Sequence, residues 1–240
     1  MRIYVAMPLW VGEQDDLLQR CLDAWAESEH DVTIEIDANR PCTFYCGDKR
    51  VHVYVNLDET YRGFQQTWYH RHRMVERLNR YDLFVYQEGD MLITRENIEA
   101  WLEWVEYIPD QWGLRFVRFV RAEDGQRYVD AARPIDPWDV LEHEGRRFMW
   151  HDLPFAASYV LTHAQLKRCI EKKAFSLKAK KVLFGSSEDA CSEPYIRGFD
   201  RVVFPADDID RFLIEHMSGK YTDIGITLEE FKKHSCVSEL

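Results

Sequence analysis

Two carboxylates separated by one glycine follow an apolar run near the middle of the chain. The run 83–86 is β-branched or aromatic at most positions, which is typical of a strand buried on both faces, and Glu88 and Asp90 come just after it. Two acids spaced in this way on a turn can converge on one hard divalent cation and leave its other positions to water and diphosphate oxygens. The pattern predicts that Glu88 and Asp90 bind Mn²⁺ or Mg²⁺ together with a sugar nucleotide. An acidic turn before a helix is the alternative interpretation.

The elements around this strand are expected to form an α/β fold. Short apolar strands alternate with amphipathic helices over the first hundred residues, and a hairpin is expected at 114–131 around an Asp-Gly turn. Open sheets of this kind bind ligands beyond the carboxyl ends of their strands, which is where the two acids would lie. The sequence therefore predicts a mostly parallel, mixed central sheet flanked by helices. The expected strands include 2–7, 32–36, 51–55, 83–86 and 155–161, and the expected helices include 13–26, 62–79, 94–108, 188–196 and 208–215.

Composition and charge limit the classes of function. A chain of 240 residues that is 46% hydrophobic can bury the core of one domain. The net charge of -11 makes nucleic acid an unexpected partner, and the scattered spacing of the six cysteines favours free thiols. No apolar run approaches the ~20 residues that cross a bilayer, so we expect no transmembrane segment. The first strand begins too early to leave room for a secretory signal, which predicts a cytoplasmic protein.

Several motifs occur in a characteristic order along the chain. They are Thr67-Trp68-Tyr69-His70-Arg71, Glu88-Gly89-Asp90-Met91, Ala157-Ser158-Tyr159-Val160-Leu161-Thr162, Ser187-Glu188-Asp189 and His216. Together they resemble glycosyltransferases of the GT-A fold that use nucleotide sugars and carry an Asp-x-Asp motif. The resemblance covers most of the chain and implies one GT-A-like nucleotide-binding sandwich over 1–240, with a donor half (1–110) and an acceptor half (111–240). The sequence departs from the family pattern at Glu88, which has the longer arm, and at 156–158, which lacks the glycines often found there.

The resemblance also implies a metal site. In that superfamily the Asp-x-Asp motif holds the metal and the donor diphosphate, and a C-terminal histidine can complete the site, which corresponds here to Glu88, Asp90 and His216. Lys220 follows in a loop, where its charge would neutralise the diphosphate as the tail closes over the donor. His216 would otherwise be a helix C-terminal residue that the dipole favours.

An acidic pair at the start of an expected helix is the candidate for catalysis. An inverting transfer needs one base that removes the proton of the acceptor hydroxyl while its oxygen attacks the anomeric carbon. The resemblance assigns that role to Asp189 and contact with the acceptor hydroxyl to Glu188, and the two roles could be exchanged. Acids in a first helical turn also stabilise the helix without doing any chemistry.

The donor nucleotide is expected near the end of the first strand. Pro8 and Trp10 emerge there, Trp10 could stack on a base, and Asp37 after the next strand could accept a hydrogen bond from ribose or base. Loop packing and turn chemistry would explain the same residues. Arg71 lies on the apolar stripe of its helix, so it should pair with an acid such as Asp90 or Asp37, or reach the donor phosphate.

These features together predict a metal-dependent glycosyltransferase. It would move a sugar from a UDP- or GDP-sugar to a hydroxyl of a glycan or another acceptor, with inversion. Two alternatives are a catalytically silent module that binds nucleotide sugars and a nucleotidyltransferase. The second would normally carry a glycine- and basic-rich phosphate loop after the first strand, and residues 7–13 contain one glycine and no lysine or arginine.

Overall fold

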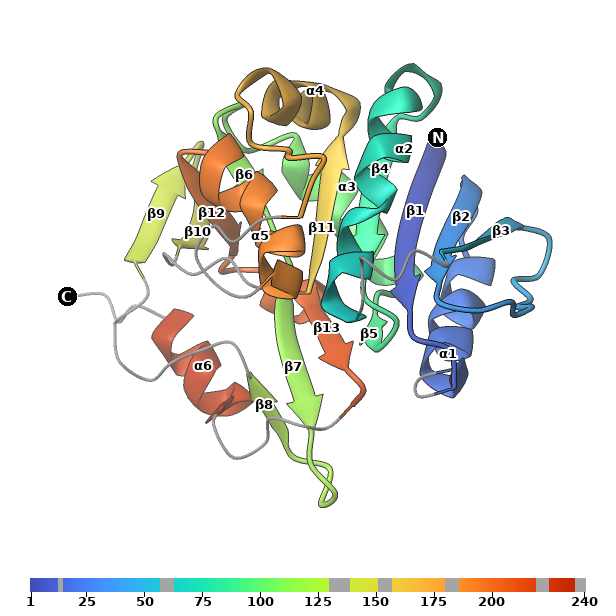
Figure 1. Ribbon diagram of the computed structural model, residues 1–240. Coiled ribbons are helices and arrows are strands. Elements are labelled where there is room, and N and C mark those ends of the chain that lie inside the picture. The colour runs from blue at the N-terminus through green and yellow to red at the C-terminus, as the bar shows by residue number, and fades with distance from the viewer. Residues whose placement is uncertain are drawn as a thin grey trace.

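The first sheet of the fold has five strands and contains the strand that precedes the two acids (Figure 1). The computed structural model describes residues 1–12, 15–56, 63–129, 139–150, 157–179, 186–218 and 225–235, and the strand order in this sheet is β11-β4-β1-β2-β3. Four strands run parallel and β11 is antiparallel to β4, so the carboxyl ends of the four meet at one edge. The strands are β1 (Arg2–Leu9), β2 (Asp31–Ala38), β3 (Arg50–Val55), β4 (Leu83–Gln87) and β11 (Ser158–Thr162).

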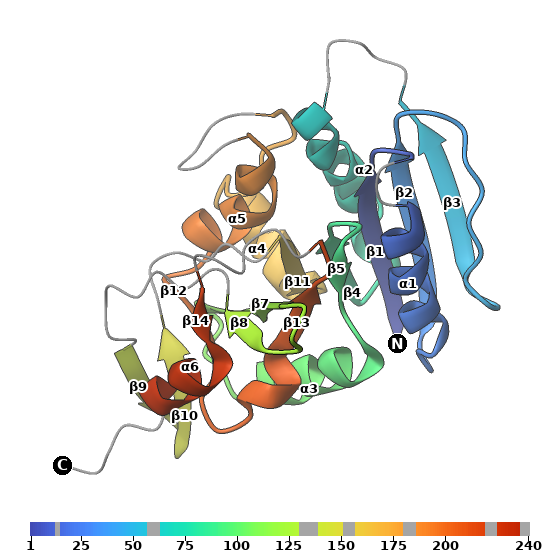
Figure 2. The ribbon, with the colours of Figure 1, turned by 90° about the horizontal axis from the view of Figure 1, so that it is seen from below.

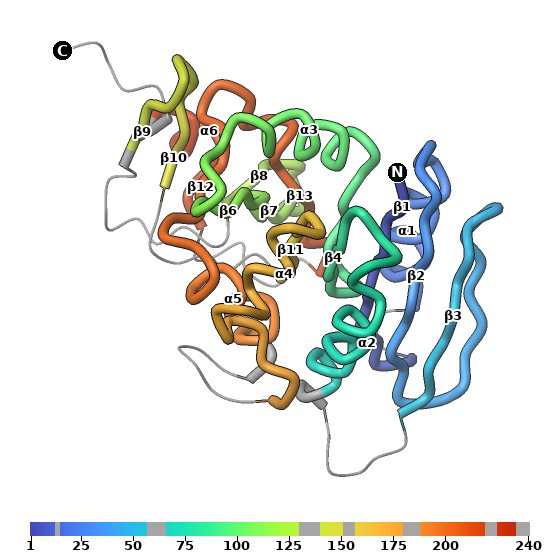
Figure 3. The backbone as a smooth tube through the Cα atoms, turned by 90° about the horizontal axis from the view of Figure 1, so that it is seen from above, coloured from blue at the N-terminus to red at the C-terminus, as the bar shows by residue number. Residues whose placement is uncertain are grey.

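Helices cover both faces of this sheet because its strands are apolar on both faces. Along β1, Ile3 and Val5 belong to a hydrophobic cluster with α1 and α3, whereas Tyr4 and Ala6 belong to a second cluster with α2, α4 and α5. Figure 2 shows α2 and α3 on opposite sides of β4, and Figure 3 shows β1, β2 and β3 side by side. Within the described ranges, no helix has the length and apolar character to cross a membrane. The helices are α1 (Asp15–Ala26), α2 (His70–Glu76), α3 (Arg95–Val105), α4 (His163–Glu171) and α5 (Ser186–Gly198).

Two further mixed sheets use mainly the second half of the chain. Their strand orders are β6-β12-β10-β9 and β14-β8-β7-β13-β5. In the second of these, β13 is antiparallel to β5 and places His216 opposite Met91, so a late segment lies beside the turn that carries the acids. The elements are β5 (Met91–Leu92), β6 (Trp112–Leu114), β7 (Val117–Arg121), β8 (Arg127–Val129), β9 (Asp139–His143), β10 (Arg146–Trp150), β12 (Arg201–Pro205), β13 (Leu213–His216), β14 (Ile226–Thr227) and α6 (Leu228–Ser235).

The fold class predicted from the sequence is confirmed. The first sheet is mostly parallel, the other sheets are mixed, and helices flank them. The expected hairpin is present as β7 and β8, and Thr94 and Thr162 each begin a helix with a capping box.

Two predicted helices were wrong in part. The segment expected as a helix over 62–79 divides into the 3₁₀ helix η2 (Gly63–Trp68), α2, and a second 3₁₀ turn, η3 (Leu78–Arg80). The segment 208–215 forms only a short 3₁₀ turn, η4 (Ile209–Phe212), before it becomes β13. Because β13 pairs with β7 on one side and β5 on the other, long-range pairing overrides its helical pattern. His216 is therefore a strand residue, which removes the helix-dipole interpretation.

Candidate functional site

The acid turn, defined as Glu88–Asp90, lies where β4 ends at the carboxyl edge of the parallel strands. Asp90 and His216 are buried, and Glu88 keeps some exposed surface. The Nε2 atom of His216 is 3.2 Å from Asp90 Oδ2 and 2.7 Å from Ser218 Oγ. The structure therefore brings Asp90 and His216 into direct contact.

Two side chains of α1, Trp25 and Cys21, contact the residues on either side of the acid turn. The buried Gln87 accepts a hydrogen bond from Trp25 Nε1 at 2.8 Å and donates one to the carbonyl of Met91 at 2.5 Å. The Cys21 thiol donates to the same carbonyl at 3.2 Å. These contacts fix both ends of the turn, because Gln87 precedes it and Met91 follows it.

We expect Gln87→Leu to lower the free energy of unfolding by about 1–3 kcal/mol, because the indole N–H of Trp25 would lose its acceptor and the carbonyl of Met91 would lose its amide donor and keep the weaker thiol donor of Cys21. Urea unfolding measures this loss. Gln126→Leu, at an exposed position, is the matched control and should change stability by less than about 0.5 kcal/mol. Equal effects of the two substitutions would contradict the bracing role of Gln87.

The charges at the acid turn repel each other. Burial and the neighbouring Asp90 raise the pKa of Glu88 from 4.5 to about 8. Burial also disfavours ionised Asp90, but the hydrogen bond and the charge of His216 outweigh burial and lower the pKa of Asp90 overall. The two carboxyl groups thus titrate far apart, as is common where acids share a site.

The raised pKa of Glu88 predicts a pH-dependent stability of the metal-free protein. Below about pH 4.5 this carboxyl group is neutral in both states, and between about pH 4.5 and 8 only the unfolded chain ionises, so stability is lost as the pH rises. The pKa of Asp90 is lowered, so its contribution changes only below its ordinary value of 3.8. Unfolding by urea at about pH 5.5 and about pH 8 measures the difference. Glu88→Gln should reduce this difference, and an unchanged difference in the variant would contradict the assignment.

The chemistry of the acid turn suits a divalent cation. Carboxylate oxygens and an imidazole nitrogen are ligands for Mn²⁺, and a cation would relieve the repulsion between Glu88 and Asp90. In the part of the chain that the structure describes, no group of three His, Cys, Asp or Glu side chains is arranged to hold a metal ion. Metal binding by Glu88, Asp90 and His216 stays a prediction.

Arg118 is a part of the site that the sequence interpretation missed. This residue of β7 is buried, and its positive charge favours the ionised forms of both Glu88 and Asp90. It lies between Val117 and Phe119, which are buried as well, so the simple alternation of a half-exposed strand does not identify it. A cation inside an apolar run was the available signal, because a buried guanidinium needs acidic or anionic partners.

The two predicted catalytic acids lie in the first turn of α5, as expected from the Ser-Glu-Asp motif. Glu188 is partly exposed, and it lies near enough to the acid turn for its charge to contribute to the raised pKa of Glu88. Asp189 has no exposed surface. The prediction from the sequence put Asp189 first as the base, with Glu188 as the alternative, and exposure favours the exchanged roles.

Ala157 lies beside the acid turn, in the segment that lacks the glycines often found in the family pattern. Ala157 accepts a hydrogen bond from the amide of Glu88 at 3.2 Å and has a φ of +51°, the left-handed region that usually favours glycine. The loop conformation is thus present at Ala157 although the residue is not glycine. Asn or Gly would adopt it at lower cost.

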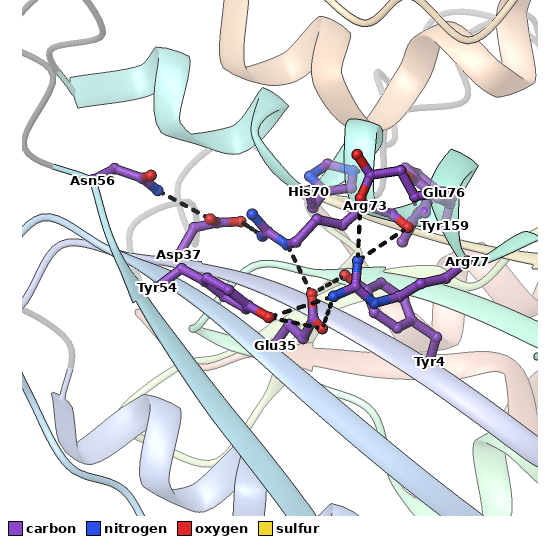
Figure 4. A network of polar contacts seen from close by, with 11 residues as sticks. Tyr4, Glu35, Asp37, Tyr54, Asn56, His70, Arg73, Glu76, Arg77 and Tyr159 are labelled. Atoms are coloured by element: carbon purple, nitrogen blue, oxygen red, sulfur yellow. Dashed lines mark hydrogen bonds and ion pairs between the residues drawn. The ribbon is translucent and has the colours of Figure 1, made fainter. Parts of the chain in front are cut away.

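The residues predicted to bind the donor nucleotide are only partly accessible. Pro8 pairs with Asp37 across β1 and β2, and Trp10 is 42% exposed beyond the strand end. Asp37 is buried, accepts a hydrogen bond from Asn56 Nδ2 at 3.0 Å and lies 2.5 Å from Arg73 Nη2 (Figure 4). A role of Asp37 in donor binding stays a prediction, and its position is set by these two side chains.

A buried network beneath α2 was not anticipated from the sequence. Arg73 and Arg77 both reach the carboxylate of Glu35, and Tyr4 donates a hydrogen bond to it at 2.6 Å (Figure 4). The network joins the α2 segment to β2, because Arg73 lies in the helix and Arg77 directly after it, whereas both acids lie in the strand. Glu35 alternates with buried apolar residues along β2, and an acid at such a position requires cationic partners.

Two further predicted residues have different outcomes. Arg71 is buried but pairs with Glu193 of α5 at 2.5 Å, and not with Asp37 or Asp90. The acid and the arginine are 122 residues apart, so no local pattern could join them. Lys220 lies outside the described residues.

The chain is similar to known proteins in fold and not in sequence. No protein-family model and no curated protein sequence matches the chain. The crystal structure of S. aureus TarS 1-349 is similar in fold, with a TM-score of 0.50, 12% identity, and coverage of 91% of this chain and 61% of that one. The structure of S. aureus TarS 1-349 in complex with UDP-GlcNAc gives a TM-score of 0.51, 11% identity, and coverage of 92% and 62%. The likeness supports a glycosyltransferase-like fold, and this chain spans about three fifths of the length of the matched TarS chain.

Proposed function

We propose that this protein is a metal-dependent glycosyltransferase that uses a nucleotide sugar and inverts the anomeric centre. The proposal rests on one observation: Asp90 and His216 are in contact at the carboxyl edge of a parallel sheet, with the charges of Glu88, Arg118 and Glu188 beside them. Ligands bind at this edge in open α/β sheets. The likeness of the fold to a protein crystallised with UDP-GlcNAc supports a nucleotide sugar, and UDP-sugars are the first donors to test.

Glu88, Asp90 and His216 would hold Mn²⁺ or Mg²⁺, which when bound supplies positive charge to the leaving diphosphate. Arg118 would add a second positive charge on the same side. The hydrogen bonds of Gln87 and Cys21 to the carbonyl of Met91 would keep the acid turn in place during the reaction. Preorganised charge of this kind acts where negative charge develops during the reaction.

Glu188 is our candidate for the base. Asp189, the buried residue next to it, would have a structural role in the first turn of α5. A base must reach the acceptor hydroxyl, and of the two acids Glu188 has exposed surface and Asp189 has none. The carboxylate of Glu188 would take the hydroxyl proton, the acceptor oxygen would form a bond to the anomeric carbon, and the bond from that carbon to the diphosphate oxygen would break. The electron pair of the broken bond leaves with the diphosphate.

A thermal-shift panel tests the proposal at the level of donor and metal. We expect one nucleotide sugar to raise the melting temperature when Mn²⁺ is present and much less when it is absent, because a ligand that binds only the folded state stabilises it by mass action. Transfer to simple hydroxyl acceptors or hydrolysis of the same donor would then show activity. Binding without either reaction would indicate the catalytically silent module, and no binding of any nucleotide sugar would reject both.

A further inference from the structure

Helix α5 contains a proline that removes one of its own hydrogen bonds. In an α-helix the carbonyl of residue i accepts from the N–H of residue i+4, so the carbonyl of Ala190 would pair with residue 194. That residue is Pro194, which has no N–H. The carbonyl of Ala190 is therefore left without its helical donor directly after Glu188 and Asp189.

Arg71 of α2 supplies the missing donor. Its Nη2 atom donates a hydrogen bond to the carbonyl of Ala190 at 2.6 Å, and its Nη1 atom lies 2.5 Å from Glu193 Oε2. The guanidinium is buried between the rings of Trp68 at 4.3 Å and Phe175 at 4.6 Å. One rigid fork thus satisfies the backbone of α5 with one arm and a buried carboxylate with the other.

Ser176 also holds Glu193. The amide and the hydroxyl of Ser176 donate to its two carboxylate oxygens at 2.9 Å and 2.6 Å. The carbonyl of the same serine accepts from Arg71 Nη1 at 3.0 Å. These bonds fix the angle of the guanidinium, so the arm that reaches Ala190 has little freedom.

The other side of the first turn of α2 contacts the strand that leads to the acid turn. His70 stacks on Tyr86 of β4 with ring centroids 4.5 Å apart, and its Nε2 is 2.7 Å from the hydroxyl of Tyr159. Tyr86 lies two residues before Glu88. Adjacent residues of α2 therefore contact β4 near Glu88 and α5 near Glu188.

From these contacts we infer that Arg71 is a positioning residue for the reaction: it fixes the first turn of α5, and with it Glu188, relative to the acid turn. The inference rests on the proposed function for its catalytic consequence. The interruption at Pro194 makes the first turn of α5 dependent on a donor from outside the helix. The sequence predicted an ion pair with Asp90 or Asp37, or contact with the donor phosphate, and the structure pairs Arg71 with Glu193 behind the acceptor-side acids.

A double-mutant cycle between Arg71 and Pro194 tests the inference. Lysine at position 71 keeps the charge beside Glu193 but lacks the second arm, so Arg71→Lys should lower kcat for sugar transfer by about tenfold or more, with the donor KM changed by less than about twofold. Pro194→Ala gives the Ala190 carbonyl a donor within the helix. Combined with Arg71→Lys, it should restore kcat to within about threefold of the Pro194→Ala variant.

Hydrogen exchange provides a readout that does not depend on activity. Amides in the first turn of α5 should exchange faster in Arg71→Lys and return toward the rate of the unsubstituted protein in the double variant, while amides of α3 stay unchanged. Arg73→Lys is the matched control, because Arg73 lies on the same helix but contacts Glu35 and Asp37, and it should show no coupling to Pro194. Equal effects of Arg71→Lys in the two backgrounds, in exchange and in kcat, would overturn the inference. A protein that transfers no sugar would reject the proposed function, and the exchange cycle would still decide the positioning of α5.

Discussion

Replacing Asp90 with asparagine is expected to lower metal-stimulated turnover of the nucleotide sugar by about 100-fold or more, because the loss of a residue that only supports a metal ligand already costs about 10–100-fold and Asp90 is proposed as a ligand itself. Asparagine has nearly the same shape and can still pair with His216, so the fold should remain intact. It lacks the negative charge that a divalent cation needs from its ligand. Initial rates of donor turnover at several Mn²⁺ concentrations measure the change, and circular dichroism checks the fold.

Asp48→Asn serves as the control for the Asp90 substitution. Asp48 is largely exposed, and its ion pair with Lys49 is of the surface kind that contributes little to stability. The control variant should keep both its activity and its response to Mn²⁺. Turnover of Asp90→Asn equal to that of the control would reject the metal site at the acid turn.

Replacing Glu188 with glutamine should lower kcat for transfer by about 100-fold or more, since a general base contributes 10²–10⁴ to the rate. The donor KM and the melting temperature should change little, because the side chain is partly exposed. Asp189→Asn should act differently. Asp189 is fully buried, so we expect its substitution to lower the melting temperature as well as the rate.

Glu229→Gln controls for the general effect of an acid in a first helical turn. Glu229 occupies such a position in α6 and is exposed, so its loss should cost no more than about 1 kcal/mol of stability and leave transfer unchanged. Steady-state kinetics with a nucleotide sugar and a hydroxyl acceptor, together with thermal melts, separate the three variants. Full transfer by Glu188→Gln combined with an inactive, normally stable Asp189→Asn would show that Asp189 is the base.

The sequence determined the parts of the fold that follow from local periodicity. The strands β1, β2, β3 and β4, the helix α1, the N-cap at Thr94 and the capping box at Thr162 were all predictable, because their side-chain spacing and their end residues set the conformation within a few residues. The acid turn was predictable for the same reason. Two carboxylates directly after a buried strand must lie at the carboxyl edge of the sheet.

Only the tertiary structure decided how this edge is completed. His216 reaches Asp90 because β13 pairs with β5, although the segment has a helical pattern when it is considered alone. Arg71 pairs with Glu193, and Asp37 with Arg73, because the packing of α2 against α5 and β2 brings together residues that are far apart in the chain. Exposure likewise separates Glu188 from Asp189, which are adjacent in sequence. Local spacing determines which face a residue takes on its own element, whereas its partners depend on which elements pack together, and that is settled by burial and pairing over the whole chain.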